Sequence, residues 1–278
     1  MKKHTTRQRG SNNTKKEIKT VSDLPTTTAH QSRLRLFQAT RRPVRGVWEI
    51  ETAWGKVKIS GRLGQTHADV LDAMLYTAEK VGLTPDGRIK LLVDFAKVRS
   101  IARQKSGKII KTDDKTKNRI VYHSSLEYLV DDLMGAVVEV MEPKHLAEKG
   151  HIIDHIYMAV DSNGIPLKRP NPLGGSRNLR TVIFGTTGTK FLKEDLGVKY
   201  NPSGISRLRH GGSQAVARIV LTHTDQPNGG WHLDTLIAHI CGNITEQELW
   251  NRRREIKKDA VELSKIGIII NNDKVSRT

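Results

Sequence analysis

The last fifth of the chain limits the possible folds more than any other part of the sequence. Between His232 and Val275, a short apolar segment is followed by a turn, a long basic segment with helical periodicity, and two short apolar stretches. This order predicts a short helix, a tight turn, a long helix and a two-stranded tip. A helix–turn–helix followed by a β-hairpin is the plan of a winged-helix DNA-binding domain.

The long helix is expected to begin at Thr245. Thr245 and Glu248 have the spacing of a capping box, in which each side chain satisfies a free backbone N–H of the first turn. Gly267 predicts the end of the helix, because glycine readily adopts the left-handed C-cap conformation. Apolar residues recur at helical spacing along one side, which we expect to be buried. They are Leu249, Ile256, Ala260 and Leu263.

The opposite side of this helix carries polar and basic residues that suit DNA. Gln, Asn and Arg can pair with base edges, whereas Lys and Arg neutralise phosphates. The residues predicted to contact bases are Gln247, Asn251 and Arg254. The residues predicted to bind phosphates are Arg252, Arg253, Lys257, Lys258, Lys265 and, in the hairpin, Lys274. A merely solvated polar face is the alternative, which the basic character of this side disfavours.

The charge of the whole chain agrees with a nucleic-acid partner. The 278 residues carry a formal net charge of +18, which favours nucleic acid or an anionic membrane surface. A membrane is disfavoured because no apolar run approaches the roughly 20 residues needed to span a bilayer. Aromatic residues make up only 5% of the sequence, so stacking on single strands is disfavoured and duplex DNA is favoured. The single cysteine, Cys241, excludes an internal disulfide, and a cytoplasmic protein is the expectation.

The sequence divides into three segments and predicts an α+β, helix-rich fold. Residues 1–45 are basic with few, aperiodic apolar residues, so we expect a disordered basic N-terminal arm. Residues 46–185 are predicted to form a first winged-helix-like domain, and residues 186–278 a second one that contacts DNA bases. The predicted helices of the first domain include residues 65–81 and an acidic helix over residues 124–140, with a loop over residues 106–119.

Other chemistries were considered and set aside. The run Gly185–Lys190 lacks the spacing of a phosphate-binding loop, and Phe191 stands where that motif needs Ser or Thr. His232, His239 and Cys241 are not followed by a second ligand pair at zinc spacing. No arrangement of a nucleophile with a base, or of paired carboxylates, stands out. We therefore expect a protein that is not an enzyme, with no metal and no cofactor.

Two segments resemble a known family. The run from Leu63 to Ala73, LGQTHADVLDA, resembles the opening helix of the first domain in winged-helix plasmid replication initiators of the RepA/RepE/TrfA group. The run from Arg252 to Ile268, a basic helix that ends in LSKIGI, is similar to the recognition helix and wing of their second domain. As an architecture the resemblance covers roughly residues 60–278.

This resemblance implies tandem winged-helix domains that bind repeated double-stranded DNA sites at an origin. It further implies a homodimer formed through the first domain, repression of the protein's own gene, and contacts with a host replication initiator and helicase. The protein would then be cytoplasmic and associated with the nucleoid or a plasmid. Two alternatives stay open from the sequence: a winged-helix transcriptional repressor, and a basic RNA-binding or ribosome-associated protein.

Overall fold

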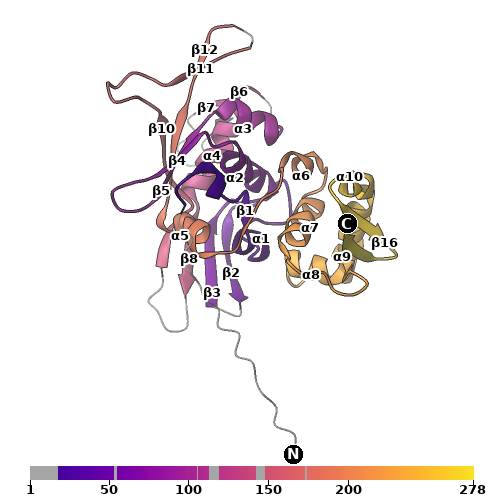
Figure 1. Cartoon of the computed structure of the whole chain (residues 1–278). Helices are drawn as coiled ribbons and strands as arrows, with labels where there is room; N and C mark the ends of the chain where they lie inside the picture. Colours follow the sequence, from indigo (N-terminus) through magenta and orange to yellow (C-terminus); the bar gives the residue numbers. More distant parts are fainter. Residues whose placement is uncertain (1–17, 53–54, 105, 113–118, 142–147, 173) are drawn as a thin grey trace, which may run out of the picture.

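The computed structural model of the protein has two separate cores of buried apolar side chains. We call residues 18–199 the N-terminal unit and residues 200–278 the C-terminal unit. Figure 1 shows them side by side, with helix α7 (Gly211–Thr222) on the side of the C-terminal unit that faces the N-terminal unit. The fold is mixed α+β, as predicted. The residues described are 18–52, 55–104, 106–112, 119–141, 148–172 and 174–278.

Two four-stranded antiparallel sheets form the frame of the N-terminal unit. The first has the order β2 (Gly46–Thr52), β3 (Gly55–Gly61), β8 (Val137–Met141) and β9 (Glu148–His151). The second has the order β10 (Ile153–Met158), β13 (Arg180–Phe184), β5 (Ile89–Val93) and β4 (Lys80–Leu83). In β5 buried and more exposed residues alternate, so one face of that strand packs on the core.

Helices α2 (Gln65–Thr77), α3 (Phe95–Ile101), α4 (Ser125–Gly135) and α5 (Thr186–Glu194) contribute buried residues to the core of this unit. Phe191 and Leu192 of α5 belong to the core of the N-terminal unit. The domain boundary predicted at residue 186 is therefore too early, because the apolar side of α5 packs on the N-terminal unit and not on the C-terminal unit.

A hairpin extends the second sheet away from the body of the molecule (Figure 1). Strands β11 (Lys168–Pro170) and β12 (Ser176–Asn178) pair at its tip, between β10 and β13. Strand β10 pairs with β13 from Ile153 to Met158, so the segment between them returns to the same sheet. Arg169 of β11 donates to Glu79 at 2.6 Å and Arg177 of β12 donates to buried Asp94 at 2.9 Å, so ion pairs tie the hairpin to the body.

Three predicted elements of the N-terminal unit differ from the structure. The helix expected over residues 65–81 ends at Thr77, because residues 80–83 pair with β5 as strand β4. The acidic helix ends at Gly135, and Val137 begins β8. Residues 106–112 and Arg119 are not a loop, because β6 (Ser106–Thr112) pairs with β7 (Arg119–Ser124), while residues 113–118 of the predicted loop lie outside the described residues. In each case strand pairing overrides local helical or polar character. The partner strand is close in sequence for β4 and β6, and distant for β8, which pairs with β3.

The prediction of a disordered basic arm over residues 1–45 is wrong for residues 18–45, while residues 1–17 lie outside the described residues. This segment contains the 3₁₀ helix η1 (Val21–Asp23), strand β1 (Thr27–Thr28), which pairs with β14 (Gly197–Val198), and helix α1 (Ala29–Arg33). Its apolar residues are few but are placed in the main core. Those buried there are Ile18, Leu24, Leu34, Leu36 and Phe37.

The C-terminal unit is a compact arrangement of helices with a three-stranded antiparallel sheet. Its sheet has the order β15–β17–β16, so the last strand lies in the middle. The helices after α7 are α8 (Leu233–Cys241), α9 (Glu246–Lys258) and α10 (Ala260–Ser264), and α6 (Ser203–Arg207) precedes it. The strands are β15 (Trp231–His232), β16 (Ile268–Asn271) and β17 (Lys274–Arg277).

The long basic helix is interrupted at Asp259, whereas the sequence predicted one helix as far as Gly267. Asp259 has φ −92° and ψ 6° and separates α9 from α10. Its side chain is buried and accepts hydrogen bonds from the backbone N–H of His210 at 3.0 Å and from the His210 ring at 3.1 Å. The contact with His210, which lies 49 positions earlier in the sequence, therefore stabilises the interruption between α9 and α10.

A buried ion cluster joins the two units. Arg218 of α7 donates to Asp69 at 2.6 Å and to Asp72 at 3.0 Å, both on α2, and also to Gln65 at 2.7 Å. Tyr200 donates to Asp72 at 2.8 Å. Burial would lower the pKa of Arg218, but the two carboxylates raise it. Burial raises the pKa of Asp72 despite the opposite effect of Arg218.

The Arg218→Met substitution should therefore strongly destabilise the fold. Removing the guanidinium leaves Asp69 and Asp72 buried without a counter-charge, at a cost of about 3–5 kcal/mol. Equilibrium denaturation by urea measures this loss. The matched control is Arg207→Met, since Arg207 is exposed at the end of α6 and its replacement should cost less than about 0.5 kcal/mol. Equal losses in the two variants would contradict the role of the cluster.

Candidate nucleic-acid interface

The first turn of α9 is fixed by the predicted capping box. Thr245 Oγ1 accepts a hydrogen bond from the Glu248 backbone N–H at 3.2 Å, and the Glu248 carboxylate accepts one from the Thr245 backbone N–H at 2.9 Å. These backbone and side-chain hydrogen bonds from Thr245 lower the pKa of Glu248. The start of the helix is thus set locally, as the sequence predicted.

The side of α9 predicted to be buried packs on the rest of the C-terminal unit. Ile256 and, beyond the break, Leu263 are fully buried, while Leu249 is partly buried against the same core. Helix α9 contacts both α7 and α8. Because α7 also carries Arg218, the position of α9 is linked through α7 to the N-terminal unit.

The predicted base-contacting residues do not all face the same way. Gln247, Asn251 and Arg254 are all exposed. Asn251, however, lines a cleft between the two units, whereas Gln247 and Arg254 do not. Lys258 is exposed on the same side of the helix as Gln247 and Arg254 at about 100° per residue, and has no ion pair with any described residue. The outward face of α9 therefore includes Gln247, Arg254 and Lys258 but not Asn251, so it differs slightly from the predicted face.

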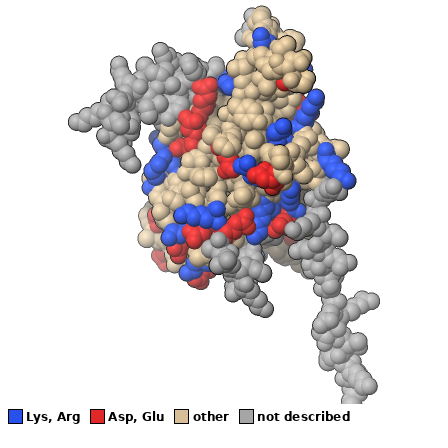
Figure 2. Space-filling model, turned by 90° about the vertical axis from the view of Figure 1, so that its left-hand side faces the viewer, with Lys and Arg blue, Asp and Glu red and all other residues tan. Residues whose placement is uncertain are grey.

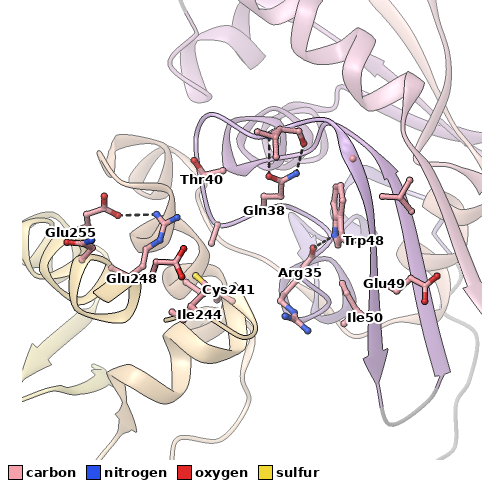
Figure 3. Close-up of a pocket in the computed structure, with 17 residues that line it drawn as sticks. Arg35, Gln38, Thr40, Trp48, Glu49, Ile50, Cys241, Ile244, Glu248 and Glu255 are labelled. Atoms are coloured by element: carbon pink, nitrogen blue, oxygen red, sulfur yellow. Dashed lines mark hydrogen bonds and ion pairs between the residues drawn. The ribbon is translucent and has the colours of Figure 1, made fainter. Parts of the chain in front are cut away.

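The cleft has a volume of about 680 Å³. Figure 3 shows Arg35, Trp48 and Ile50 on its N-terminal wall and Cys241, Ile244, Glu248 and Glu255 on its C-terminal wall. The exposed valines Val44 and Val47, which lie on either side of exposed Arg45, also line it. This side of α9 is thus open, but it faces the N-terminal unit.

Most of the predicted phosphate-binding residues form ion pairs or hydrogen bonds within the protein. Arg253 donates two hydrogen bonds to Asp234 of α8, at 2.9 and 2.6 Å. The partners of the others are Glu255 for Arg252 (3.1 Å), Asp273 for Lys257 (2.7 Å), Glu262 for Lys265 (2.6 Å) and His232 for Lys274 (2.7 Å). These pairs are at least partly exposed, so each stabilises the fold by only about 0–1 kcal/mol and a phosphate can compete for the cation.

Trp250 was not among the residues predicted from the sequence to face DNA. Its side chain is 50% exposed, and the Arg254 guanidinium carbon lies 5.5 Å from its ring centroid. A signal was present, since Trp250 falls outside the apolar stripe of Leu249, Ile256 and Leu263 and hence had to face solvent or a partner. The outward face of α9 therefore combines an aromatic residue with cations.

The hairpin that follows α10 turns sharply beside α9. Asn272 and Asp273 have φ of +46° and +61°, the left-handed values of a tight two-residue hairpin turn. The ion pair between Asp273 and Lys257 attaches this turn to α9. The two-stranded tip predicted after the long helix is confirmed by the pairing of β16 with β17.

The remaining candidate sites show ordinary structural roles. Lys190 pairs with Glu148 at 3.0 Å, and burial raises the pKa of the Cys241 thiol. Within the described ranges, no three His, Cys, Asp or Glu side chains gather as metal ligands would. No helix there combines the length and the apolar character needed to cross a bilayer.

The charge on the far side of the molecule is mixed. Figure 2 views the side of the N-terminal unit remote from α9, where Lys and Arg lie among Asp and Glu. Ion pairs within the N-terminal unit include Arg169–Glu79, Lys97–Glu79 and Arg88–Asp154. This face is therefore less suited to a polyanion than a face of one sign.

No protein-family model matches the chain, and no curated protein matches its sequence. Among solved structures, the crystal structure of the RctB domains 2-3 (RctB-155-483) is similar. The TM-score is 0.47 and the identity 12%, over 89% of this chain and 94% of that chain. At this level the likeness concerns the course of the backbone alone.

The capping box gives a direct test of how α9 is positioned. Thr245→Ala should lower the free energy of unfolding by about 1 kcal/mol, because two backbone N–H groups lose their reciprocal partners. Thr245→Ser keeps a hydroxyl at the N-cap and should stay close to the wild-type protein. Urea denaturation compares the three proteins. If the alanine and serine variants were equally stable, the cap would not be what fixes the start of α9.

Proposed function

We propose that this protein is a sequence-specific double-stranded DNA-binding protein whose C-terminal unit is a winged-helix domain. In this proposal α8 and α9 are the helix–turn–helix, α9 enters the major groove, and the β16–β17 hairpin is the wing. The observation that carries the proposal is the outward face of α9. It exposes Gln247, Trp250, Arg254 and Lys258 on a helix whose opposite side packs on the core of the C-terminal unit through Leu249 and Ile256.

The order of elements in the C-terminal unit supports this proposal. Helix α7, strand β15, helices α8 and α9 and the β16–β17 pair follow one another, with the last strand between the other two. The N-terminal unit carries two four-stranded sheets, which is more than a hairpin wing requires. The proposal of a DNA-reading domain therefore rests on the C-terminal unit.

Arg254 and Lys258 should differ in how they contribute to DNA binding. Arg254→Ala should cost about 1–3 kcal/mol at one base position and relax the preference there, because the fork of its guanidinium can pair with a guanine edge. Lys258→Ala should weaken binding to every sequence and reduce the salt slope by about one, because a lysine neutralises phosphate. Duplex selection followed by titrations at several salt concentrations measures both effects.

The control for these variants is Lys80→Ala. Lys80 is exposed on β4, in the sheet of the N-terminal unit that lies far from α9 in Figure 1. This variant should bind DNA like the wild-type protein. Competition between duplex DNA and structured RNA tests the alternative RNA-binding function. If Arg254→Ala and the wild-type protein selected the same sequence with the same affinity, α9 would not contact the bases.

We further propose that the DNA-binding function serves plasmid replication initiation with repression of the protein's own gene. The support is the resemblance of residues 63–73 and 252–268 to plasmid initiators. The first segment forms the start of α2, which carries Asp69 and Asp72 of the buried cluster, and the second runs through α9 and α10 to the wing. Repeated origin sites, a homodimer and host replication proteins are the partners that this function would require.

A replication assay separates an initiator from a repressor. A plasmid that carries only this gene and its flanking DNA as an origin should be maintained in a bacterial host if the protein initiates replication. The Arg254→Ala variant should reduce plasmid maintenance, whereas Lys80→Ala should not. Maintenance that fails while the wild-type protein still represses a reporter fused to its own upstream region would favour the transcriptional repressor.

A further inference from the structure

Trp250 is the large apolar side chain on the outward face of α9. Half of its surface is exposed, whereas Leu249 beside it packs partly against the core. Together with Gln247 and Arg253, Trp250 lines a shallow hollow at the amino-terminal end of α9. Roughly 100 Å² of indole surface is thus available to a partner.

The side chain of Arg254 is held by this indole. The guanidinium carbon lies 5.5 Å from the ring centroid, within the roughly 6 Å of a cation–π contact. Arg254 has no ion pair with a described carboxylate, in contrast to Arg252 and Arg253 on the same helix. Its fork of donors is therefore oriented by the ring and still free to pair with a base.

The chemistry of this pair matches two features of the major groove. Thymine presents a C5 methyl group, which favours apolar contacts, and guanine presents O6 and N7, which accept a bidentate pair from arginine. Residues 250 and 254 are four apart and so are separated by about 6 Å along the helix, which is less than two base-pair steps of about 3.4 Å. Both contacts can therefore be made to base pairs that lie close together.

We infer that Trp250 is a specificity-determining residue that contacts a thymine methyl group, while the indole holds Arg254 on a guanine within two base pairs of that thymine. This inference rests on the proposed DNA-binding function and adds a preferred base step to it. The cationic neighbours Arg254 and Lys258 and the net charge of +18 favour DNA over a protein as the occupant of this surface.

The decisive experiment removes the methyl group alone. Duplexes selected from a random library by the full-length protein should contain a thymine within two base pairs of a guanine. Replacing that thymine by deoxyuridine should weaken binding of the wild-type protein about fourfold, since one methyl group leaves an apolar contact. The Trp250→Ala variant should bind the thymine and deoxyuridine duplexes equally well.

Arg254 is tested in the same way with 7-deazaguanine, which lacks the N7 acceptor. The wild-type protein should lose affinity on this duplex, and Arg254→Met, which has no donor for N7, should not distinguish it from guanine. The control is Val261→Ala, because Val261 is an exposed apolar residue of α10 that this inference leaves without a base contact. This variant should retain both preferences.

The possible failures are distinguishable. If the library yields no preferred duplex, the proposed function fails and this inference with it. If a preferred duplex is found but deoxyuridine weakens Trp250→Ala as much as the wild-type protein, DNA binding stands and the role of Trp250 is wrong. The role is also wrong if Trp250→Ala keeps the methyl preference and instead changes the mass of the free protein in light scattering, since Trp250 would then contact protein.

Discussion

The arrangement of the two units depends on the buried contact between Arg218 and the two aspartates of α2. An arginine buried in a protein is costly unless every donor is matched, and here its donors reach Asp69, Asp72 and Gln65. Gln214 of the same helix adds a hydrogen bond to Asp69 at 2.9 Å. Hydrogen bonds and ion pairs are directional, so they fix the orientation of one helix on another more closely than apolar packing alone does. The cluster therefore specifies how α7 lies on α2.

This orientation also sets the position of the α9 surface that is proposed to face DNA. Helix α7 packs on α2 with one side and on α8 and α9 with the other. Fixing α7 thus determines which side of α9 faces the cleft and which faces away from the N-terminal unit. Asn251 and Arg252 fall on the cleft side, and Trp250, Arg254 and Lys258 on the outward side. One side of α9 thus faces the N-terminal unit across the cleft, and another side faces solvent.

The sequence predicted the local features of the fold well and the non-local ones poorly. The capping box at Thr245, the tip at Asn272 and the amphipathic pattern of α9 depend on neighbours in sequence, and each is found in the structure. The break at Asp259 depends on His210, and the order of residues 18–45 depends on a core built from later segments. The same reasoning explains the candidate site. Periodicity placed Gln247 and Arg254 on the exposed side, but the partners that occupy Arg253 and Lys257 come from α8 and the hairpin turn.

The internal partners of the basic residues also bear on selectivity. In the proposed complex, Arg253 and Lys257 must exchange their contacts with acidic residues for contacts with phosphates. Each of them therefore contributes less to the binding free energy than a cation without an acidic partner would. The acidic partners Asp234 and Asp273 remain nearby and repel phosphate. Binding that relies on charge alone is thereby weakened. Contacts made by Trp250 and Arg254, which give up no acidic partner among the described residues, then account for a larger share of the affinity for a preferred sequence.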